Sequence, residues 1–411
     1  MNKIFTTIIF ITMCVFVRAQ VPSIWLLDST YIDHDGTTLS IDATGSWGSN
    51  GLDNAWLSDM VIGGHINTFQ KDRLLKNLED RNRIGGEARG GISFWSFADS
   101  VFGNSNWGYQ ANISTHYNAS LNFDKDLFRL IYFGNNSFRN DSLDFSNTEL
   151  MYQSYQKFGF GIFNKKHFSS IRLSVVSGQQ MQQLSLDRAT WITSFDGTST
   201  SLVYSGEYFE GDTAKSGFGA GRGLGVCLDV EFNIPMKDGK GFISIAMNDI
   251  GYIGWNNAQH YQFDSTFVWN GLEVNDVLNV DEQNIGLPIW QDTLGIQGKK
   301  ETVWKAMPTT VNFRMLRKLN EKHSYEGGIH LRPNTAALPF VFLGMNHFLG
   351  KGLMISERIS FGDFGRFAVG GELQWKFTDR AFIRLGTNHA FGLMSKNARG
   401  ASAYGGLMFN I

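Results

Sequence analysis

Apolar and polar residues alternate along several long segments of the chain. From Trp107 to Leu121 every second residue is mostly apolar, and the residues between them are mostly Ser, Asn, Gln and His. The same alternation recurs at 224–234, 325–331 and 367–377. A period of two residues places successive side chains on opposite faces of a β-strand. The pattern therefore predicts strands with one apolar and one polar face.

The length of these segments separates two kinds of all-β protein. Strands of a soluble sandwich have about five or six residues, whereas the segments here run to about 10 to 15 residues. A strand of a transmembrane barrel needs roughly 9–11 residues to cross the bilayer at a tilt. Bulky aromatic residues near the segment ends are typical of a barrel's aromatic girdle. We therefore predict an all-β fold, a transmembrane antiparallel β-barrel.

The links between the predicted strands alternate in length. Short links are expected at 164–168, 235–240, 319–322, 349–352 and 378–380. The longest link, 251–308, is expected to be an extracellular loop, because outer-membrane barrels combine short periplasmic turns with long external loops. If residue 411 ends a strand on the periplasmic side, every short link falls on that side as well.

The strand count follows from an even-number rule for such barrels. The sequence offers about 17 candidates between residues 38 and 411. We interpret 184–208 as a hairpin within an outer loop and 38–48 as an N-terminal segment inside the lumen. This leaves about 14 strands, with 16 as the alternative. A helix is expected over 69–83, ended by Gly85-Gly86.

The first residues are typical of a secretory signal peptide. Lys3 precedes an apolar stretch at 4–17, and Val17-Arg18-Ala19 resembles a cleavage site. No later stretch approaches 18 consecutive apolar residues, so no helical span is expected. We therefore expect a signal peptide at 1–19 and one barrel domain at 20–411, with 20–37 as a luminal plug.

Composition and motifs exclude several function classes. The 411 residues include 46 Gly and 14% aromatic residues, and the formal net charge is −2, which disfavours a disordered chain and a nucleic-acid partner. There is no G-x-S-x-G, H-E-x-x-H or C-x-x-C motif. We expect no enzyme, no cofactor and no metal.

Charged residues on the predicted polar faces are candidates for lining the lumen, because a charge facing lipid is costly. They form either a polar pathway or an ion-pair network that fills the lumen. Glu357 falls on an apolar face, where a bulge or a partner subunit would relieve it. The candidates are Glu87, Arg89, Arg172, Asp229, Glu231, Glu326, Arg332, Glu372, Lys376 and Arg384.

The long link at 251–308 is rich in aromatic residues, of which Trp255, Trp269 and Trp290 are candidates for binding. Exposed aromatic side chains in a loop suggest a surface for a partner or glycan. The same side chains could instead fold inward and close the mouth of the barrel.

The final residues resemble the C-terminal signal by which outer-membrane barrels are recognised for assembly. The elements of the match are Tyr404, Gly406, Phe409 and Ile411. The resemblance implies export to the bacterial outer membrane, with the barrel-assembly machinery and outer-membrane lipid as partners.

Further motifs resemble an uncharacterised family of Gram-negative outer-membrane barrels, distantly similar to the FadL and PorV type. They lie at 127–135, 155–161, 248–256 and 307–309. The resemblance implies 14 strands, an N-terminal luminal element and passage of hydrophobic molecules. We therefore expect a channel or transporter for small or hydrophobic molecules. The alternative is a structural or accessory barrel of an outer-membrane complex, such as a secretion apparatus, with other outer-membrane or periplasmic proteins as partners.

Overall fold

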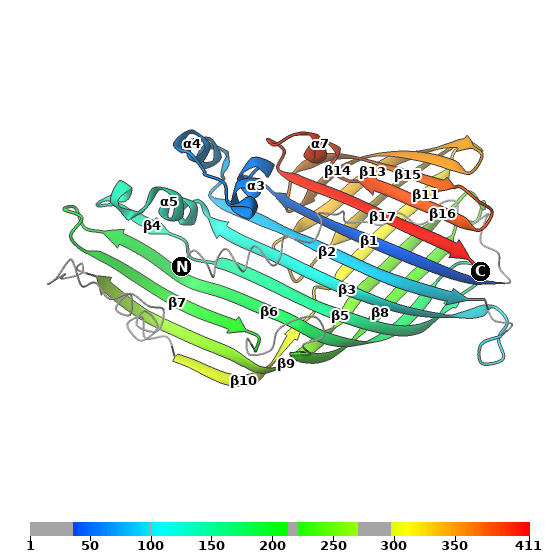
Figure 1. The fold of residues 1–411 in the computed structure, drawn as a ribbon, viewed down its shortest axis with the longest axis horizontal. Coiled ribbons are helices and arrows are strands. Elements are labelled where there is room, and N and C mark those ends of the chain that lie inside the picture. Colours follow the sequence, from blue (N-terminus) through cyan, green and yellow to red (C-terminus); the bar gives the residue numbers. More distant parts are fainter. Residues whose placement is uncertain (1–35, 98–99, 213–220, 270–296) are drawn as a thin grey trace.

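The computed structural model describes residues 36–97, 100–212, 221–269 and 297–411. The predicted signal peptide, and the predicted plug except for Gly36 and Thr37, lie outside the described residues. Fourteen antiparallel strands close into a barrel (Figure 1). In order around the wall they are β1 (Thr37–Ser49), β2 (Arg81–Ser96), β3 (Trp107–Asp124), β5 (Thr148–Asn164), β6 (Ser170–Thr193), β8 (Gly223–Pro235), β9 (Gly241–Trp269), β11 (Thr310–Lys318), β12 (His323–Leu331), β13 (Leu338–Gly350), β14 (Leu353–Asp363), β15 (Phe367–Lys376), β16 (Ala381–Thr387) and β17 (Gly400–Asn410).

Three further strands are not among these fourteen and extend the sheet beyond the closed ring: β4 (Ser142–Asp144), β7 (Thr200–Glu210) and β10 (Gln297–Ala306). β7 pairs with the C-terminal halves of β6 and β9, and β8 pairs with their N-terminal halves. β7 and β8 therefore occupy one column of the wall, one above the other. β10 pairs with residues 252–262 of β9, and the part of the wall formed by β6, β7, β9 and β10 extends further than the other strands, to the left in Figure 1.

The expected number of strands is confirmed, but the expected set is not. The segment 38–48 is a wall strand rather than a luminal segment, because β1 pairs with β17 from Thr38 opposite Asn410 to Gly48 opposite Gly400. Its other edge pairs with β2. Without β1 the barrel would leave two open strand edges, which carry unpaired backbone groups. The hairpin expected at 184–208 is present: the C-terminal half of β6 pairs with β7.

The five predicted short links all lie at one end of the barrel, which we call the short-turn end. They join β5 to β6, β8 to β9, β11 to β12, β13 to β14 and β15 to β16. Ile411 lies at the same end, where its N–H donates to Thr37 O. The shared end predicted for the five short links is therefore confirmed, but the alternation is not strict, because the link 364–366 between β14 and β15 at the opposite end is also short.

The helices lie at the opposite end, which we call the mouth (Figure 1). They are α3 (Asn54–Ile62), α4 (Thr68–Asn77), α5 (Lys125–Phe133), the short 3-10 helix η1 (Asn135–Phe138) and α7 (Ala390–Met394). None of the described helices is long and apolar enough to span a bilayer. The helix predicted at 69–83 was too long, because α4 ends before Leu78, which is extended. Gly85 and Gly86 belong to β2, where Gly86 lies close to the backbone of β1.

The two faces of the wall differ in polarity in the way expected of a membrane barrel. Outward residues such as Leu173, Val226 and Leu343 are 64%, 60% and 62% exposed. Inward residues such as Asn346 and Gln374 are completely buried. A soluble protein buries its apolar face, whereas a barrel in lipid exposes it and keeps polar groups inside. We call the outward apolar surface the apolar band.

One local expectation was wrong, and one of the two explanations offered for Glu357 is excluded. The segment 251–308 is not one long loop, because β9 continues through Trp269 and β10 begins at Gln297. Glu357 sits on no bulge, since β14 keeps its register on both sides of it. Its side chain faces outward and is 72% exposed, 3.3 Å from His347 Nε2.

Candidate functional site in the barrel interior

A buried lysine forms the centre of one charged cluster inside the wall. Lys157 Nζ on β5 lies 2.9 Å from Asp229 Oδ1 on β8 and 2.5 Å from Asp249 Oδ1 on β9. Arg172 of β6 pairs with the other oxygen of Asp229 at 2.8 Å. Two cations thus face two carboxylates, and removal of either partner would leave a buried charge without compensation. We call these four residues the Lys157 cluster.

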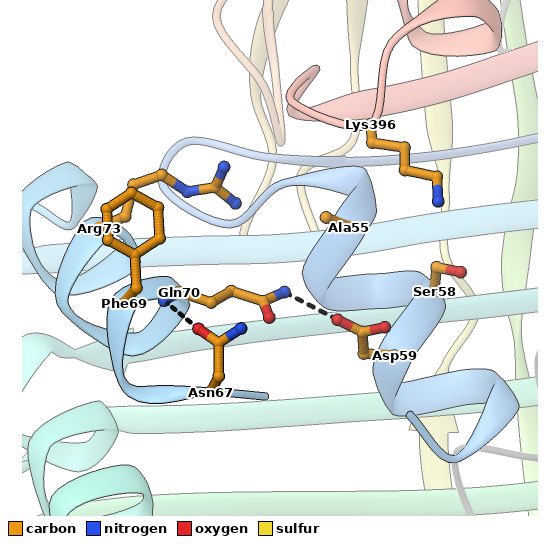
Figure 2. Close-up of a pocket in the computed structure, with 8 residues that line it drawn as sticks. All are labelled: Ala55, Ser58, Asp59, Asn67, Phe69, Gln70, Arg73 and Lys396. Atoms are coloured by element: carbon orange, nitrogen blue, oxygen red, sulfur yellow. Dashed lines mark hydrogen bonds between the residues drawn. The ribbon is translucent and has the colours of Figure 1, made fainter. Parts of the chain in front are cut away.

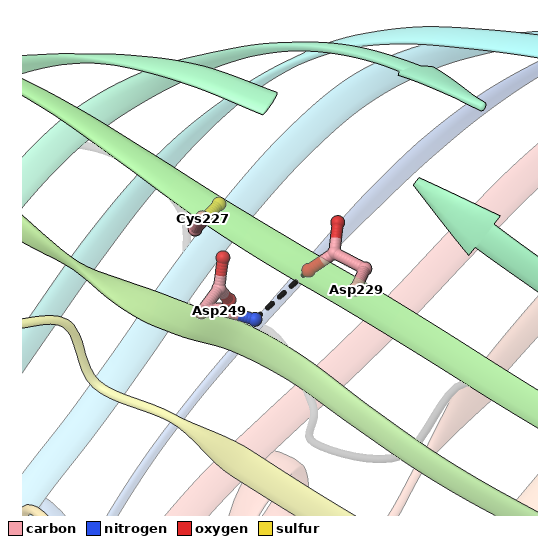
Figure 3. A group of neighbouring side chains, drawn as sticks. All are labelled: Cys227, Asp229 and Asp249. Carbon is pink, nitrogen blue, oxygen red and sulfur yellow. Dashed lines mark hydrogen bonds between the residues drawn. The ribbon is translucent and has the colours of Figure 1, made fainter. Parts of the chain in front are cut away.

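A β-bulge brings Asp249 into this cluster. The register between β8 and β9 shifts at Leu228 and Val230, and Asp249 has a φ of 60°. Asp is among the few non-glycine residues that adopt this left-handed conformation readily. The backbone N–H of Asp249 donates to Asp229 Oδ1 at 2.8 Å, as Figure 3 shows. The bulge therefore aims one carboxylate at Lys157 and one N–H at Asp229.

Cys227, Asp229 and Asp249 are also the described residues whose donor atoms lie close enough together to consider a metal site (Figure 3). Their ligand atoms lie within 4.8 Å of one another, and all three side chains are buried. Lys157, however, already binds both carboxylates. A metal cation would have to displace its ammonium group, so we assign no metal to this cluster.

A second charged cluster lies inside the barrel on the strands β11, β12 and β14. Glu326 of β12 pairs with Arg314 of β11 and, at 2.6 Å, with Arg358 of β14. β13 lies between β12 and β14, and its residue opposite both Glu326 and Arg358 is Gly344. A Cβ atom there would lie 3.3 Å from Glu326 Cγ. The missing side chain lets Arg358 reach over β13 to the carboxylate.

Other contacts cross the lumen. Glu87 of β2 pairs at 2.8 Å with Arg332, which follows β12 on the opposite side of the ring. His116 Nδ1 of β3 lies 4.0 Å from Asp249 Oδ2. Since these strands are not neighbours in the wall, the contacts bridge the interior. The described interior is therefore spanned by polar side chains at these levels.

Above the Lys157 cluster lies an apolar cluster, which we call the Trp255 cluster. On the inner face, Tyr155 of β5 is opposite Gly178 of β6, Gly178 is opposite Gly223 of β8, and Gly223 is opposite Trp255 of β9. A Cβ atom at Gly178 would lie 2.8 Å from the indole ring of Trp255. The indole thus covers glycines on two neighbouring strands. The cluster consists of Tyr155, Val176, Met181, Phe209, Cys227, Ile253, Trp255, Ala258 and Met307.

The wall changes at the level of this cluster, where the column passes from β7 to β8. Gly211 N–H donates to Met181 O, and Arg222 N–H donates to Gly178 O, each at 2.8 Å. On the edge of β6 that faces β7 and β8, no described strand pairs with Gln179 or Gln180, whereas β5 pairs with Gln180 on the other edge. We call this place the column break. It lies at the margin of the apolar band that is nearer to the mouth, next to the outward side chain of Leu224.

The helices at the mouth enclose a separate polar cleft of about 260 Å³ between α3 and α4 (Figure 2). Gln70 Nε2 donates to Asp59 Oδ2 at 2.8 Å across this cleft, so the bond ties the two helices together. Trp56 Nε1 on α3 donates to the hydroxyl of Tyr132 on α5 at 2.7 Å, and burial raises the pKa of Tyr132. These contacts fix the helices to one another at the mouth.

The lumen candidates predicted from the sequence lie on the inward faces of their strands or, for Arg332, just beyond one. Besides the pairs above, Arg384 Nη2 lies 3.0 Å from Asp42 Oδ1, and Glu372 accepts hydrogen bonds from the Tyr404 hydroxyl and Gln374. Glu231 accepts from Asn233 at 3.2 Å, and Lys376 pairs with Asp379 near the short-turn end. Arg89 is half-buried opposite His116.

The three tryptophan candidates occupy different positions. Trp255 is not in an exposed loop: it belongs to β9 and is completely buried, because its ring covers the glycines of β6 and β8. Trp269 is the half-buried last residue of β9, and Trp290 lies outside the described residues. In the final strand β17, Tyr404 and Gly406 face inward and Phe409 faces outward, and Ile411, which follows the strand, is exposed.

Sequence reasoning found Arg172, Asp229 and Glu326 but missed the residues that pair with these carboxylates and complete the two charged clusters. Lys157, Asp249, Arg314 and Arg358 are buried, and each contacts a carboxylate or ammonium group there. Alternation alone could have found Arg358, because it follows the outward Glu357 by one residue. It could not have found Asp249, since the bulge before it shifts the period.

The fold is similar to several solved barrels at low sequence identity. The Pseudomonas putida toluene transporter TodX is 8% identical with a TM-score of 0.39, over 91% of this chain and 88% of that one. The Ralstonia pickettii toluene transporter TbuX is 9% identical with a TM-score of 0.40, over 92% and 89%. The translocator domain of autotransporter NalP from Neisseria meningitidis is 8% identical with a TM-score of 0.31, over 92% and 91%. No curated protein matches the chain in sequence. A family of unknown function, DUF5723, matches residues 40–382.

Proposed function

This chain belongs to the family of unknown function DUF5723, and we propose that it is a bacterial outer-membrane barrel that passes small apolar molecules. The observation that carries the proposal is the position of the Trp255 cluster. An apolar site inside a barrel meets the wall where the column of strands is broken, at the margin of the apolar band. A route between the bilayer margin and the interior is supported by this arrangement.

The surroundings of the cluster support an apolar rather than a charged cargo. The described residues of the cluster carry no charge. The Lys157 cluster beneath it has two cations matched by two carboxylates, so it presents no excess charge to attract an ion. Ligand sites for small molecules are mostly apolar with a few polar groups.

Uptake by intact cells tests the proposal. Gram-negative cells that produce the protein should take up the apolar dye N-phenyl-1-naphthylamine faster than cells with an empty vector. Ala258→Phe fills the Trp255 cluster and should abolish this added uptake. Ala43→Phe makes the same change on the outward face of β1 and should retain it. The amount of folded protein in the outer membrane is measured for each variant. Equal uptake with wild-type protein and empty vector would reject the proposal.

A second candidate function is that of an accessory barrel that binds a partner. The observation that favours it is the sheet of β6, β7, β9 and β10, which extends further than the rest of the wall, to the left in Figure 1. In the described part of the chain, β10 pairs with β9 alone, so its other edge is open to a further strand. Wild-type protein without uptake, but with a partner cross-linked to β10, would favour this function.

A further inference from the structure

Two hydrogen-bond donors of the Trp255 cluster are buried without a partner among the residues that the structure describes. The hydroxyl group of Tyr155 and Nε1 of Trp255 make no hydrogen bond with any residue that the structure describes. Both side chains are completely buried. Buried polar groups nearly always find a partner, because leaving one unmade forfeits its hydration without compensation. Two such groups in one apolar cluster therefore call for an explanation.

The missing partners are not a general trait of the aromatic residues in this barrel. Trp56 Nε1 donates to Tyr132, Trp191 Nε1 donates to Thr193 Oγ1, and the Tyr404 hydroxyl bonds Glu372. In each case a polar side chain lies within hydrogen-bonding distance of the aromatic donor. The Trp255 cluster differs because its other members are Val, Met, Phe, Cys, Ile and Ala side chains.

The two donor residues stand at the ends of one row on the inner face of the wall. Tyr155 and Trp255 are separated on the inner face only by Gly178 and Gly223, which have no side chains to come between them. The indole already extends over Gly178. The phenol of Tyr155 stacks on His116 with ring centroids 4.8 Å apart, which holds the ring in place. The cluster thus combines apolar walls with two fixed donors.

We propose that the Trp255 cluster binds a neutral apolar molecule that carries a hydrogen-bond acceptor, such as a ketone or aldehyde oxygen. The inference rests on the proposed function, since it names the class of molecule that passes through the site. Indole N–H is a donor only, so its partner on the ligand must be an acceptor. A neutral acceptor fits better than an anion, because the adjacent Lys157 cluster offers no unmatched cation. The ammonium group of Lys305 is already placed on the ring of Phe209, 3.3 Å from its centroid.

A matched pair of probes tests the inference. Acetophenone and ethylbenzene share a ring and a two-carbon chain, and they differ by a carbonyl group in place of a methylene group. Binding of each probe to the full chain in detergent micelles is measured by isothermal titration. Tyr155→Phe and Trp255→Phe each remove one donor and keep an aromatic ring. Each should weaken acetophenone binding about 3- to 10-fold, the range expected for one net hydrogen bond.

Ethylbenzene provides the internal control, because its affinity should change less than about twofold in both variants. Tyr109→Phe removes a hydroxyl from the outward face of β3 and should change neither affinity. An unchanged ratio of the two affinities in both cluster variants would overturn the inference, and so would a wild-type protein that binds neither probe.

The results separate this inference from the proposed function. If dye uptake depends on Ala258 but the probe ratio is insensitive to Tyr155 and Trp255, passage stands and the acceptor site falls. If the ratio responds to both variants while the wild-type protein gives no uptake, the binding site stands and passage falls.

Discussion

Lys157 Nζ lies 2.9 Å from each carboxylate oxygen of Asp229, inside the barrel and almost completely shielded from solvent. The two residues are 72 positions apart in sequence, and they meet across β6, which lies between their strands. A pair at this depth has lost its hydration, so its stability depends on every charge in the cluster being matched.

Replacing Lys157 should therefore destabilise the barrel strongly. Lys157→Met leaves Asp229 and Asp249 buried without their shared cation, and we expect a loss of about 3–5 kcal/mol in the free energy of unfolding. Arg188→Met breaks an exposed ion pair with Asp264 and should cost less than about 1 kcal/mol. Urea unfolding in micelles measures both. Equal stability of the two variants would contradict the assigned role of Lys157.

The contact between Glu87 and Arg332 should couple opposite sides of the wall. A double-mutant cycle of Glu87→Gln and Arg332→Gln is expected to give an interaction energy of about 0.5–3 kcal/mol, because the residues touch at 2.8 Å. Glu87 with Arg317 serves as the control cycle, since Arg317 pairs with Asp238 near the short-turn end. An additive result for Glu87 and Arg332 would mean that the lumen is not bridged there in solution.

Gly178 should tolerate no side chain while Trp255 is present. Gly178→Ala places a methyl group against the indole and should destabilise the barrel by about 1–3 kcal/mol. Gly90→Ala is the matched control, because the nearest atom to its added Cβ is Asp42 O at 3.9 Å. Trp255→Phe should restore part of the stability lost in Gly178→Ala. The unfolding midpoint of the double variant decides this, and a further loss would argue against the contact.

The thiol of Cys227 should report whether the interior admits solvent. Cys227 is 2% exposed, so a maleimide that carries a charged sulfonate group should not label it in the native barrel at neutral pH and should label it after unfolding in urea. Mass spectrometry counts the adducts. Rapid labelling of the native protein would show an interior open to small polar reagents, and labelling only after Ala258→Phe would show that this substitution disrupts the wall.

The sequence by itself determined the architecture of the barrel in broad terms. Alternation with a period of two assigns each side chain to a face of a strand, and the polarity of the faces indicates which one meets lipid. Segment length and the alternation of short and long links then give the class of barrel and its two ends. These features are local, so they can be recognised one segment at a time.

The tertiary structure decided which residues meet inside the wall. Closure made β1 a wall strand because β17 and β2 each need a partner, a requirement that the segment 38–48 does not reveal in isolation. Contacts such as that of Arg384 with Asp42 join residues 342 positions apart. Glycines at 178 and 344 let side chains reach across a strand, and the bulge at Asp249 turns a carboxylate inward. Periodicity assigns a face, but only the register of neighbouring strands assigns a partner.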